Sequence, residues 1–205
     1  MNPINIICIS SEYCSRGRYI AMDFTKKSGF KYYDDESLCS LLVNGDKVLV
    51  ELNQLDEKLK QPEIDEDTIQ SIKNIQDKLK PAILKAAELG HCIIHERAAM
   101  EVLRDFNGVF KVMIQANDFD QKLFYAQTDP KRQSIKSKSD VMLEEDKPII
   151  TEYIYNQDHI RRHYHNTLSK MAWGDISTYD LILNSDRLSI EQCGSVLKSI
   201  VDISF

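Results

Sequence analysis

A run of small, polar and basic residues near the start of the chain has features of a phosphate-binding loop. Residues 10–19 read Ser-Ser-Glu-Tyr-Cys-Ser-Arg-Gly-Arg-Tyr. The preceding apolar run, Ile4 to Ile9, is typical of a buried strand, and residues 19–28 have helix-compatible spacing that stops at Gly29. Where a strand leads through a loop into a helix, backbone N–H groups and the helix dipole favour an anion. The residues that would surround a bound phosphate are Ser11, Cys14, Ser15, Arg16, Gly17 and Arg18.

The same loop lacks several groups that triphosphate-binding loops normally use. Those loops need glycines for positive φ, a lysine for the β- and γ-phosphates and a Ser or Thr hydroxyl for Mg²⁺. Here Gly17 remains, and Tyr19 cannot replace the hydroxyl. Arg18, with Arg16 near it, could supply the positive charge, because guanidinium groups bind phosphate well. The alternative is an ordinary surface turn with two exposed arginines.

Short apolar runs alternate with helical patterns along the rest of the chain. Further strands are expected at residues 30–33, 92–94, 109–114 and 181–183, and a last helix at about 189–201. Ser189 and Gln192 form a capping box at the start of that helix. Asp34 can cap the helix that follows the second strand. This alternation predicts an α/β domain with three layers, a mainly parallel sheet covered by helices, and ligands at the carboxyl ends of the strands.

Two segments interrupt the alternation. Residues of about 48–90 are helical and highly charged, with expected interruptions at Pro62 and Pro81 and a stop at Gly90, and we interpret them as a helical insertion. The region of about 119–165 becomes polar at its start, with Lys-Arg-Gln-Ser-Ile-Lys-Ser-Lys-Ser-Asp at residues 131–140. That polar part is either a lid or solvated surface. Residues 1–205 are expected to form a single domain that carries both segments.

Composition excludes several classes of function. A net charge of -6 over 205 residues leaves no general basic surface for nucleic acid or anionic membranes. No apolar stretch approaches the roughly 20 residues of a membrane span, and the five scattered cysteines fit a reducing cytoplasm. The histidines at 159, 163 and 165 lack an evident third ligand, so no metal site is expected among them. The sequence does not define the oligomeric state.

Six segments together resemble the cytidylate kinase-like family, a bacterial group related to CMP kinases. Residues 10–21 resemble its S-R-E-x-G-S-G-G-R-x-I-A loop, with departures at Ser11, Cys14 and Arg16. Residues 30–34 (FKYYD) and 93–98 (IIHERA) are similar to I-P-F-Y-D and V-I-V-G-R-G. Residues 158–164 resemble a D-x-x-R-x-x-Y lid segment. Residues 173–185 resemble W-G-D-x-x-x-Y-D-L-x-I-N-[ST], and residues 188–192 resemble L-S-I-E-Q. The resemblance spans most of the chain.

The resemblance implies a fold of the P-loop NTPase type and the transfer of a phosphoryl group from ATP, with Mg²⁺, to a nucleoside monophosphate or a similar small acceptor. It implies that residues 11 and 14–18 bind the donor phosphates and that Arg18, Arg161 and Arg162 neutralise charge on the transferring group. Lys122 stands where the family often has an arginine.

Asp34 and Arg97 would hold the acceptor. For Arg97 the alternative is surface pairing with Glu96 or Glu101, and for Asp34 it is helix capping. Because Cys14 and Arg16 replace glycines of the phosphate cradle, the alternative function is a non-catalytic nucleotide-binding or regulatory protein with a degenerate P-loop.

Overall fold

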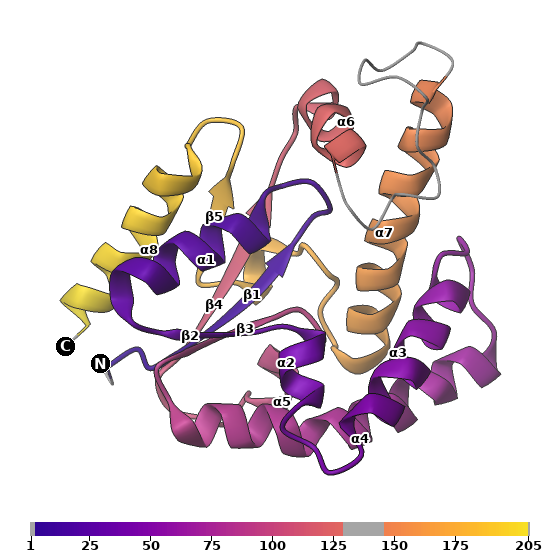
Figure 1. Cartoon of the computed structure of the whole chain (residues 1–205), viewed down its shortest axis with the longest axis horizontal. Coiled ribbons are helices and arrows are strands. Elements are labelled where there is room, and N and C mark those ends of the chain that lie inside the picture. The colour runs from indigo at the N-terminus through magenta and orange to yellow at the C-terminus, as the bar shows by residue number, and fades with distance from the viewer. Residues whose placement is uncertain (1–2, 129–145, 205) are drawn as a thin grey trace.

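The computed structural model describes residues 3–128 and 146–204 and centres on a parallel five-stranded sheet (Figure 1). Its strands are β1 (Ile6–Ser11), β2 (Lys31–Tyr33), β3 (Cys92–His95), β4 (Val109–Gln115) and β5 (Leu181–Asn184). They lie in the order β2-β3-β1-β4-β5, and every pair is parallel. All five expected strands are therefore confirmed, with ends that differ by one or two residues. The carboxyl ends of β1 and β3 lie side by side, with Ile9 opposite His95.

Helices cover both faces of this sheet (Figure 1). α1 (Gly17–Ser28) and α8 (Ile190–Ile203) pack together on one face. α2 (Asp35–Cys39), α3 (Gly45–Leu59), α4 (Glu66–Leu89), α5 (Ala99–Val102) and α7 (Lys147–Leu168) contribute to the core on the other face. α6 (Phe119–Thr128) packs against α7, and a short 3-10 turn spans Ile176–Thr178. The three-layer α/β prediction is confirmed.

The alternation of side chains along β1 shows why its sequence is apolar throughout. Ile6 and Cys8 belong to the core beneath α2–α5 and α7, whereas Ile7 and Ile9 belong to the core beneath α1 and α8. Successive side chains of a strand point to opposite faces, so a sheet covered on both sides needs apolar residues at every position. Packing against these two cores fixes the position of β1 in the sheet. It therefore also fixes where the loop after β1 begins.

Three helices differ from the expectations. α4 continues through Pro81, which does not interrupt it. Pro81 lies on the exposed side while Leu79, Ala82 and Ile83 are buried, so packing of the opposite face outweighs the loss of one helical hydrogen bond. α7 begins at Lys147, earlier than the helical content at residue 153 indicated, and residues 119–128 form a helix within the polar region. The basic segment at 131–140 lies outside the described residues.

Candidate phosphate-binding site

The loop from β1 to α1 has the backbone of a glycine-rich loop although two of its glycine positions carry side chains. Cys14 has a φ of 63° and Arg16 has a φ of 64°, both in the left-handed region. A side chain in this region costs roughly 1–2 kcal/mol per residue. These are the two glycine positions of the family pattern at which this chain carries another residue. Two residues with side chains thus adopt backbone conformations that favour glycine, and this stores strain in the loop.

The side chains at these positions are held by neighbouring elements. Cys14 packs with Tyr13 against a small apolar cluster from α6 and α7 that includes Leu123 and Ile150. Arg16 donates from Nη2 to the carbonyl of Leu188 at 3.2 Å, and its guanidinium lies 5.6 Å from the ring centre of Tyr125. These contacts account for how the loop accommodates a cysteine and an arginine.

Gly17 permits a close approach between the start of α1 and the end of β1. A Cβ at Gly17 would lie 2.5 Å from the Cβ of Ser11 and 2.7 Å from its Oγ, which is too close for any side chain. Ser15 is buried and donates its hydroxyl to the carbonyl of Glu12 at 2.8 Å. Arg16 is the N-cap residue of α1 and makes no side-chain capping hydrogen bond. The first N–H groups of α1 are therefore left without a side-chain cap, as at helix ends that bind anions.

Two cations approach the loop from α6 and α7. Nζ of Lys122 lies 2.7 Å from Oε2 of Glu12, which also accepts the N–H of Ala116 at 3.0 Å. Nε of Arg161 lies 3.4 Å from Oε1 of Glu96, and its guanidinium is 5.6 Å from the ring centre of Tyr13. The structure thus places both cations beside the loop, each paired with a carboxylate.

Asp158 joins α7 to the tip of the loop. Its Oδ1 accepts the backbone N–H of Tyr13 at 2.7 Å. Burial raises the pKa of Asp158 to about 6, and this effect outweighs the nearby charge of Arg161, which lowers it. The carboxyl group is therefore close to its titration range near neutral pH.

Asp34 and Arg97 lie at the ends of β2 and β3, and each already has protein partners. Asp34 caps α2 in a capping box with Ser37, as expected, and its Oδ2 lies 3.4 Å from Nη2 of Arg18. Arg97 is 9% exposed and makes four hydrogen bonds of 2.7–2.8 Å, two to Asp35 and two to Asp56. The alternative of surface pairing with Glu96 or Glu101 is wrong, because two other carboxylates enclose this guanidinium.

Arg162 does not share the position of Arg161. It is exposed, and its guanidinium lies 5.8 Å from the ring centre of Trp173. Successive residues of a helix point in directions about 100° apart, so only one of the two arginines can face the loop from α7. Of the two arginines, Arg161 is the one that lies beside the loop.

Sequence reasoning missed a polar network at the carboxyl ends of β1, β2 and β3. Nε2 of His95 lies 2.9 Å from Oγ of Ser11, and its Nδ1 lies 2.8 Å from the hydroxyl of Tyr32. Oε1 of Glu96 accepts both the N–H and the hydroxyl of Ser11, at 2.8 and 3.0 Å. Burial lowers the pKa of His95 and favours its neutral form. The sequence signal that could have indicated this network is the pair His95 and Glu96, which directly follows an apolar run.

Glu96, Arg97 and Ala98 form a left-handed turn after β3, with φ values of 71°, 54° and 48°. Three consecutive residues in this region are uncommon outside glycine, and such strain gathers at functional sites. The turn carries Glu96 towards Ser11 and Arg97 towards Asp35 and Asp56. The strained backbone therefore directs Glu96 to the loop after β1 and Arg97 to α2 and α3.

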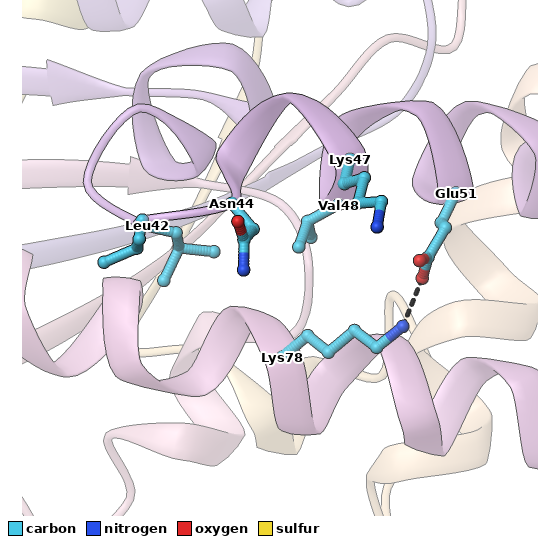
Figure 2. A pocket seen from close by; sticks show the side chains of 7 residues that line it. Leu42, Asn44, Lys47, Val48, Glu51 and Lys78 are labelled. Carbon is cyan, nitrogen blue, oxygen red and sulfur yellow. Dashed lines mark hydrogen bonds and ion pairs between the residues drawn. The ribbon is translucent and has the colours of Figure 1, made fainter.

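Open depressions on the surface of the described residues include one beside α3 and α4 and one at the ends of β4 and β5. One, of about 390 Å³, runs between α3 and α4 (Figure 2) and is lined by Leu42, Val43, Asn44, Lys47, Val48, Glu51 and Lys78. Two of the charged side chains that line it, Glu51 and Lys78, form an ion pair. The other, of about 450 Å³, lies at the carboxyl ends of β4 and β5 and is lined by Asn117, Asp118, Asn184, Asp186 and Arg187. The second depression lies at the edge of the sheet where open α/β proteins bind ligands, outside the carboxyl ends of the strands.

The strand order, the loop after β1 and the helix that follows it define an α/β protein of the P-loop type. The model of the cytidylate kinase-like family matches residues 6–187, and the chain belongs to this family. It is therefore a kinase-like protein. No match of significance is found among curated proteins.

Solved structures share the fold over the whole chain at low sequence identity. An uncharacterized protein from Eubacterium ventriosum is 19% identical, has a TM-score of 0.70, and the match covers 97% of this chain and 98% of that one. Shikimate kinase from Bacteroides thetaiotaomicron is 12% identical with a TM-score of 0.55, again covering 97% and 98%. Shikimate kinase from Acinetobacter baumannii is 7% identical with a TM-score of 0.51, covering 98% and 94%. These likenesses concern the fold.

Within residues 3–128 and 146–204, no helix is long and apolar enough to cross a membrane. The same residues contain no group of three or more His, Cys, Asp or Glu side chains placed to hold a metal ion.

Proposed function

We propose that this chain transfers a phosphoryl group from ATP, with Mg²⁺, to a small acceptor; a nucleoside monophosphate is the acceptor that the family resemblance implies. The observation that carries this proposal is the loop of residues 11–18. It keeps left-handed backbone at Cys14 and Arg16, and α1 begins beside it without a side-chain cap. A loop that stores strain in this way at a helix N-terminus is suited to holding an anion.

The donor phosphates would lie on Ser11, Cys14, Ser15, Arg16, Gly17 and Arg18. Arg18 is exposed and reaches towards Asp34 at 3.4 Å, so it stands between the loop and the acceptor side. Arg161 would exchange its long contact with Glu96 for a phosphate oxygen, and Arg162 would have to leave Trp173 to do the same. Phosphoryl transfer depends on such positioning and charge neutralisation.

The residues present fit a triphosphate, and they offer one carboxylate for its metal ion. Mg²⁺ is usually bound by one or two carboxylates together with phosphate oxygens and water. We assign this role to Glu96, which accepts the N–H of Ser11. Mg²⁺ would supply charge neutralisation on the phosphates when it binds with ATP.

The depression at the ends of β4 and β5 would receive the nucleoside of the donor. Oδ1 of Asp186 is buried there without a hydrogen-bond partner among the described residues, whereas Oδ2 accepts the N–H of Asp118 at 3.0 Å. A buried acceptor without a partner costs free energy and favours a ligand that donates a hydrogen bond. An amino group of a nucleobase has this chemistry.

A second candidate function is nucleotide binding without transfer. It is favoured by Tyr19, which is 58% exposed at the position of the metal-binding hydroxyl, and by the absence of a lysine in the loop. It is favoured also by Arg97, whose donors are occupied by Asp35 and Asp56. Such a protein would bind ATP and leave it intact.

Calorimetry with ATP, with and without Mg²⁺, followed by CMP, tests the proposal, and transfer of label from γ-³²P-ATP separates the two functions. We expect ATP to bind the wild-type chain at millimolar concentration or below and Arg18→Met to weaken binding about tenfold. Lys26→Met, at the other end of α1, is the matched control. If neither ATP nor CMP binds, both functions fail. Binding of ATP without transfer to any acceptor or to water favours the second function.

The double variant Cys14→Gly, Arg16→Gly examines whether the altered loop limits binding. Because the backbone already has the conformation of the glycine pattern, we expect its affinity for ATP to remain within about tenfold of the wild type. ATP binding that appears only in the double variant would instead indicate a degenerate loop.

A further inference from the structure

A carboxylate from α7 occupies a backbone donor at the tip of the phosphate-binding loop. Oδ1 of Asp158 accepts the N–H of Tyr13 at 2.7 Å. Tyr13 directly precedes Cys14, the first of the two loop residues that have left-handed backbone in place of glycine. In loops that lead into a helix, backbone N–H groups of this kind are donors for an anion. The donor at Tyr13 therefore already has an anionic partner, and this partner belongs to the protein itself.

Apolar contacts also join α7 to this end of the loop. The rings of Tyr13 and Tyr153 of α7 meet edge to face, with their centres 5.5 Å apart. Tyr13 packs in addition against a buried apolar cluster to which α6 contributes Leu123 and α7 contributes Ile150. These contacts involve no charge. A carboxylate at Asp158 is therefore not required to hold α7 and the loop together, and its charge needs another explanation.

A neutral side chain could make the same hydrogen bond at lower cost. The amide oxygen of an asparagine accepts an N–H as a carboxylate does, and its burial removes no charge from water. Burial raises the pKa of Asp158 to about 6, although the positive charges of Arg161 and Lys122 lower it. The ionised form of Asp158 is therefore held at this place against desolvation. What the carboxylate adds, compared with an amide, is a negative charge at the tip of the loop.

Asp158 lies where the terminal phosphate of the donor would come. Asp158 and Arg161 are three residues apart on α7 and so lie on one face of the helix. The guanidinium of Arg161 lies 5.6 Å from the ring centre of Tyr13, whose N–H is the one that Asp158 occupies. Under the proposed function, Arg161 contacts the transferring phosphoryl group. A phosphate that meets Arg161 beside the loop therefore also meets the negative charge of Asp158, and like charges so placed repel.

We infer that Asp158 competes with the terminal phosphate of the donor for the tip of the loop and thereby lowers the preference of the site for ATP over ADP. This inference rests on the proposed function and adds a specificity-determining residue to the same site. ATP has to displace the carboxylate from Tyr13 or bind against its charge. ADP lacks the phosphate that reaches Arg161, so it meets much less of this repulsion. Asp158 thus weakens the binding of the donor more than that of its product.

The first test compares three variants with the wild type by calorimetry with ATP and with ADP, in the presence of Mg²⁺. Asp158→Asn keeps an acceptor for the N–H of Tyr13 and removes the charge. We expect it to bind ATP about tenfold more tightly than the wild type and ADP at most about threefold more tightly. Glu152→Gln removes the same charge from the exposed side of α7 and should leave both affinities within about twofold of the wild type. Asp158→Glu keeps the charge and should show no gain.

The outcomes of this test separate the inference from the proposed function. If Asp158→Asn binds ATP no more tightly than the wild type, the inference is overturned and the proposed function stands. The same holds if the affinities for ATP and ADP rise equally, or if Glu152→Gln or Asp158→Glu shows the same gain. If ATP binds neither the wild type nor Asp158→Asn, the proposed function is overturned together with the inference.

The second test uses the unaltered protein and so does not depend on the folding of a variant. In the ¹⁵N-labelled wild-type chain, the backbone amide signal of Tyr13 is followed on saturation with the β,γ-imido analogue of ATP, which is not transferred, and with ADP. We expect the analogue to shift this signal more than ADP does, because only the triphosphate disturbs the contact between Tyr13 and Asp158. A shift of the Tyr13 signal that is the same for both nucleotides overturns the inference.

Discussion

Nζ of Lys122 lies 2.7 Å from Oε2 of Glu12 and joins α6 to the phosphate-binding loop. Both side chains are largely buried, with 10% and 25% of their surfaces exposed. A cation in such a place depends on its partner, because desolvation outweighs what an unpaired charge can gain. The position of α6 beside the loop therefore rests partly on this pair.

Glu12→Gln should destabilise the fold by about 2 kcal/mol, since the amide can still accept the N–H of Ala116 but leaves the charge of Lys122 unpaired. Urea unfolding at pH 7 measures the change. Asp202→Asn breaks the pair with Lys198 on the surface of α8 and should change stability by about 0.5 kcal/mol or less. Equal effects of the two substitutions would contradict the role given to Lys122.

Gly17→Ala should destabilise the protein by about 2 kcal/mol or more, because the new Cβ would lie 2.5 Å from the Cβ of Ser11. The added methyl group would also displace the start of α1 and weaken ATP binding. Gly29→Ala is the matched control. A Cβ added at Gly29 would have no atom within 4 Å, and the residue has a φ of 76°, so this substitution should cost only roughly 1 kcal/mol of backbone strain.

Ser11→Gly removes the atoms that the new methyl group would meet. The double variant Ser11→Gly, Gly17→Ala should therefore recover part of the stability lost by Gly17→Ala, as measured by thermal unfolding. Additive losses would show that the close approach is unimportant.

The order of strands and helices could be predicted from the sequence because each strand is a short apolar run and the helix ends carry local signals. Gly29 ends α1 with a φ of 76°, and Ser189 with Gln192 caps α8. These signals act between residues that are close in sequence, so no knowledge of the tertiary structure is required.

The partners of the site residues could not be predicted in this way. Arg97 pairs with Asp56, which is 41 residues away on α3, and His95 meets Ser11 across 84 residues. Such contacts follow from which strands and helices are neighbours, and sequence spacing does not contain that information. The left-handed backbone at Cys14 and Arg16 was also hidden, because glycine is the usual indicator of that conformation.

Arg97→Lys should destabilise the protein by about 2–4 kcal/mol although the charge is kept. A single ammonium cannot make the four hydrogen bonds by which Arg97 joins Asp35 on α2 to Asp56 on α3. Arg104→Lys is the matched control, since Arg104 pairs with Glu101 at the surface and should tolerate lysine within about 0.5 kcal/mol. The denaturant midpoints of the two variants are compared with that of the wild type. If Arg97→Lys lowers stability no more than Arg104→Lys, the enclosed ion pairs of Arg97 do not hold α2 and α3 together.

Asp158 makes stability depend on pH with a sign opposite to that of most acidic residues. Burial raises its pKa from 3.8 to about 6, so the folded state binds the proton more tightly than the unfolded state. The free energy of unfolding attributable to this group is therefore greatest below pH 3.8, falls as pH rises to about 6, and is constant above. Arg161 and Lys122 oppose the shift, and Glu12 reinforces it.

Asp158→Asn removes this titration while its amide oxygen can still accept the N–H of Tyr13. The variant should gain stability relative to wild type between pH 4 and 6, by an amount on the order of 1 kcal/mol and at most about 3 kcal/mol, and keep that gain at higher pH. Urea unfolding of both proteins at several pH values from 4 to 8 gives the difference, and Asp202→Asn, on the exposed side of α8, is the control variant. A difference that moves the other way with pH would mean that Asp158 is stabilised in its charged form by Arg161.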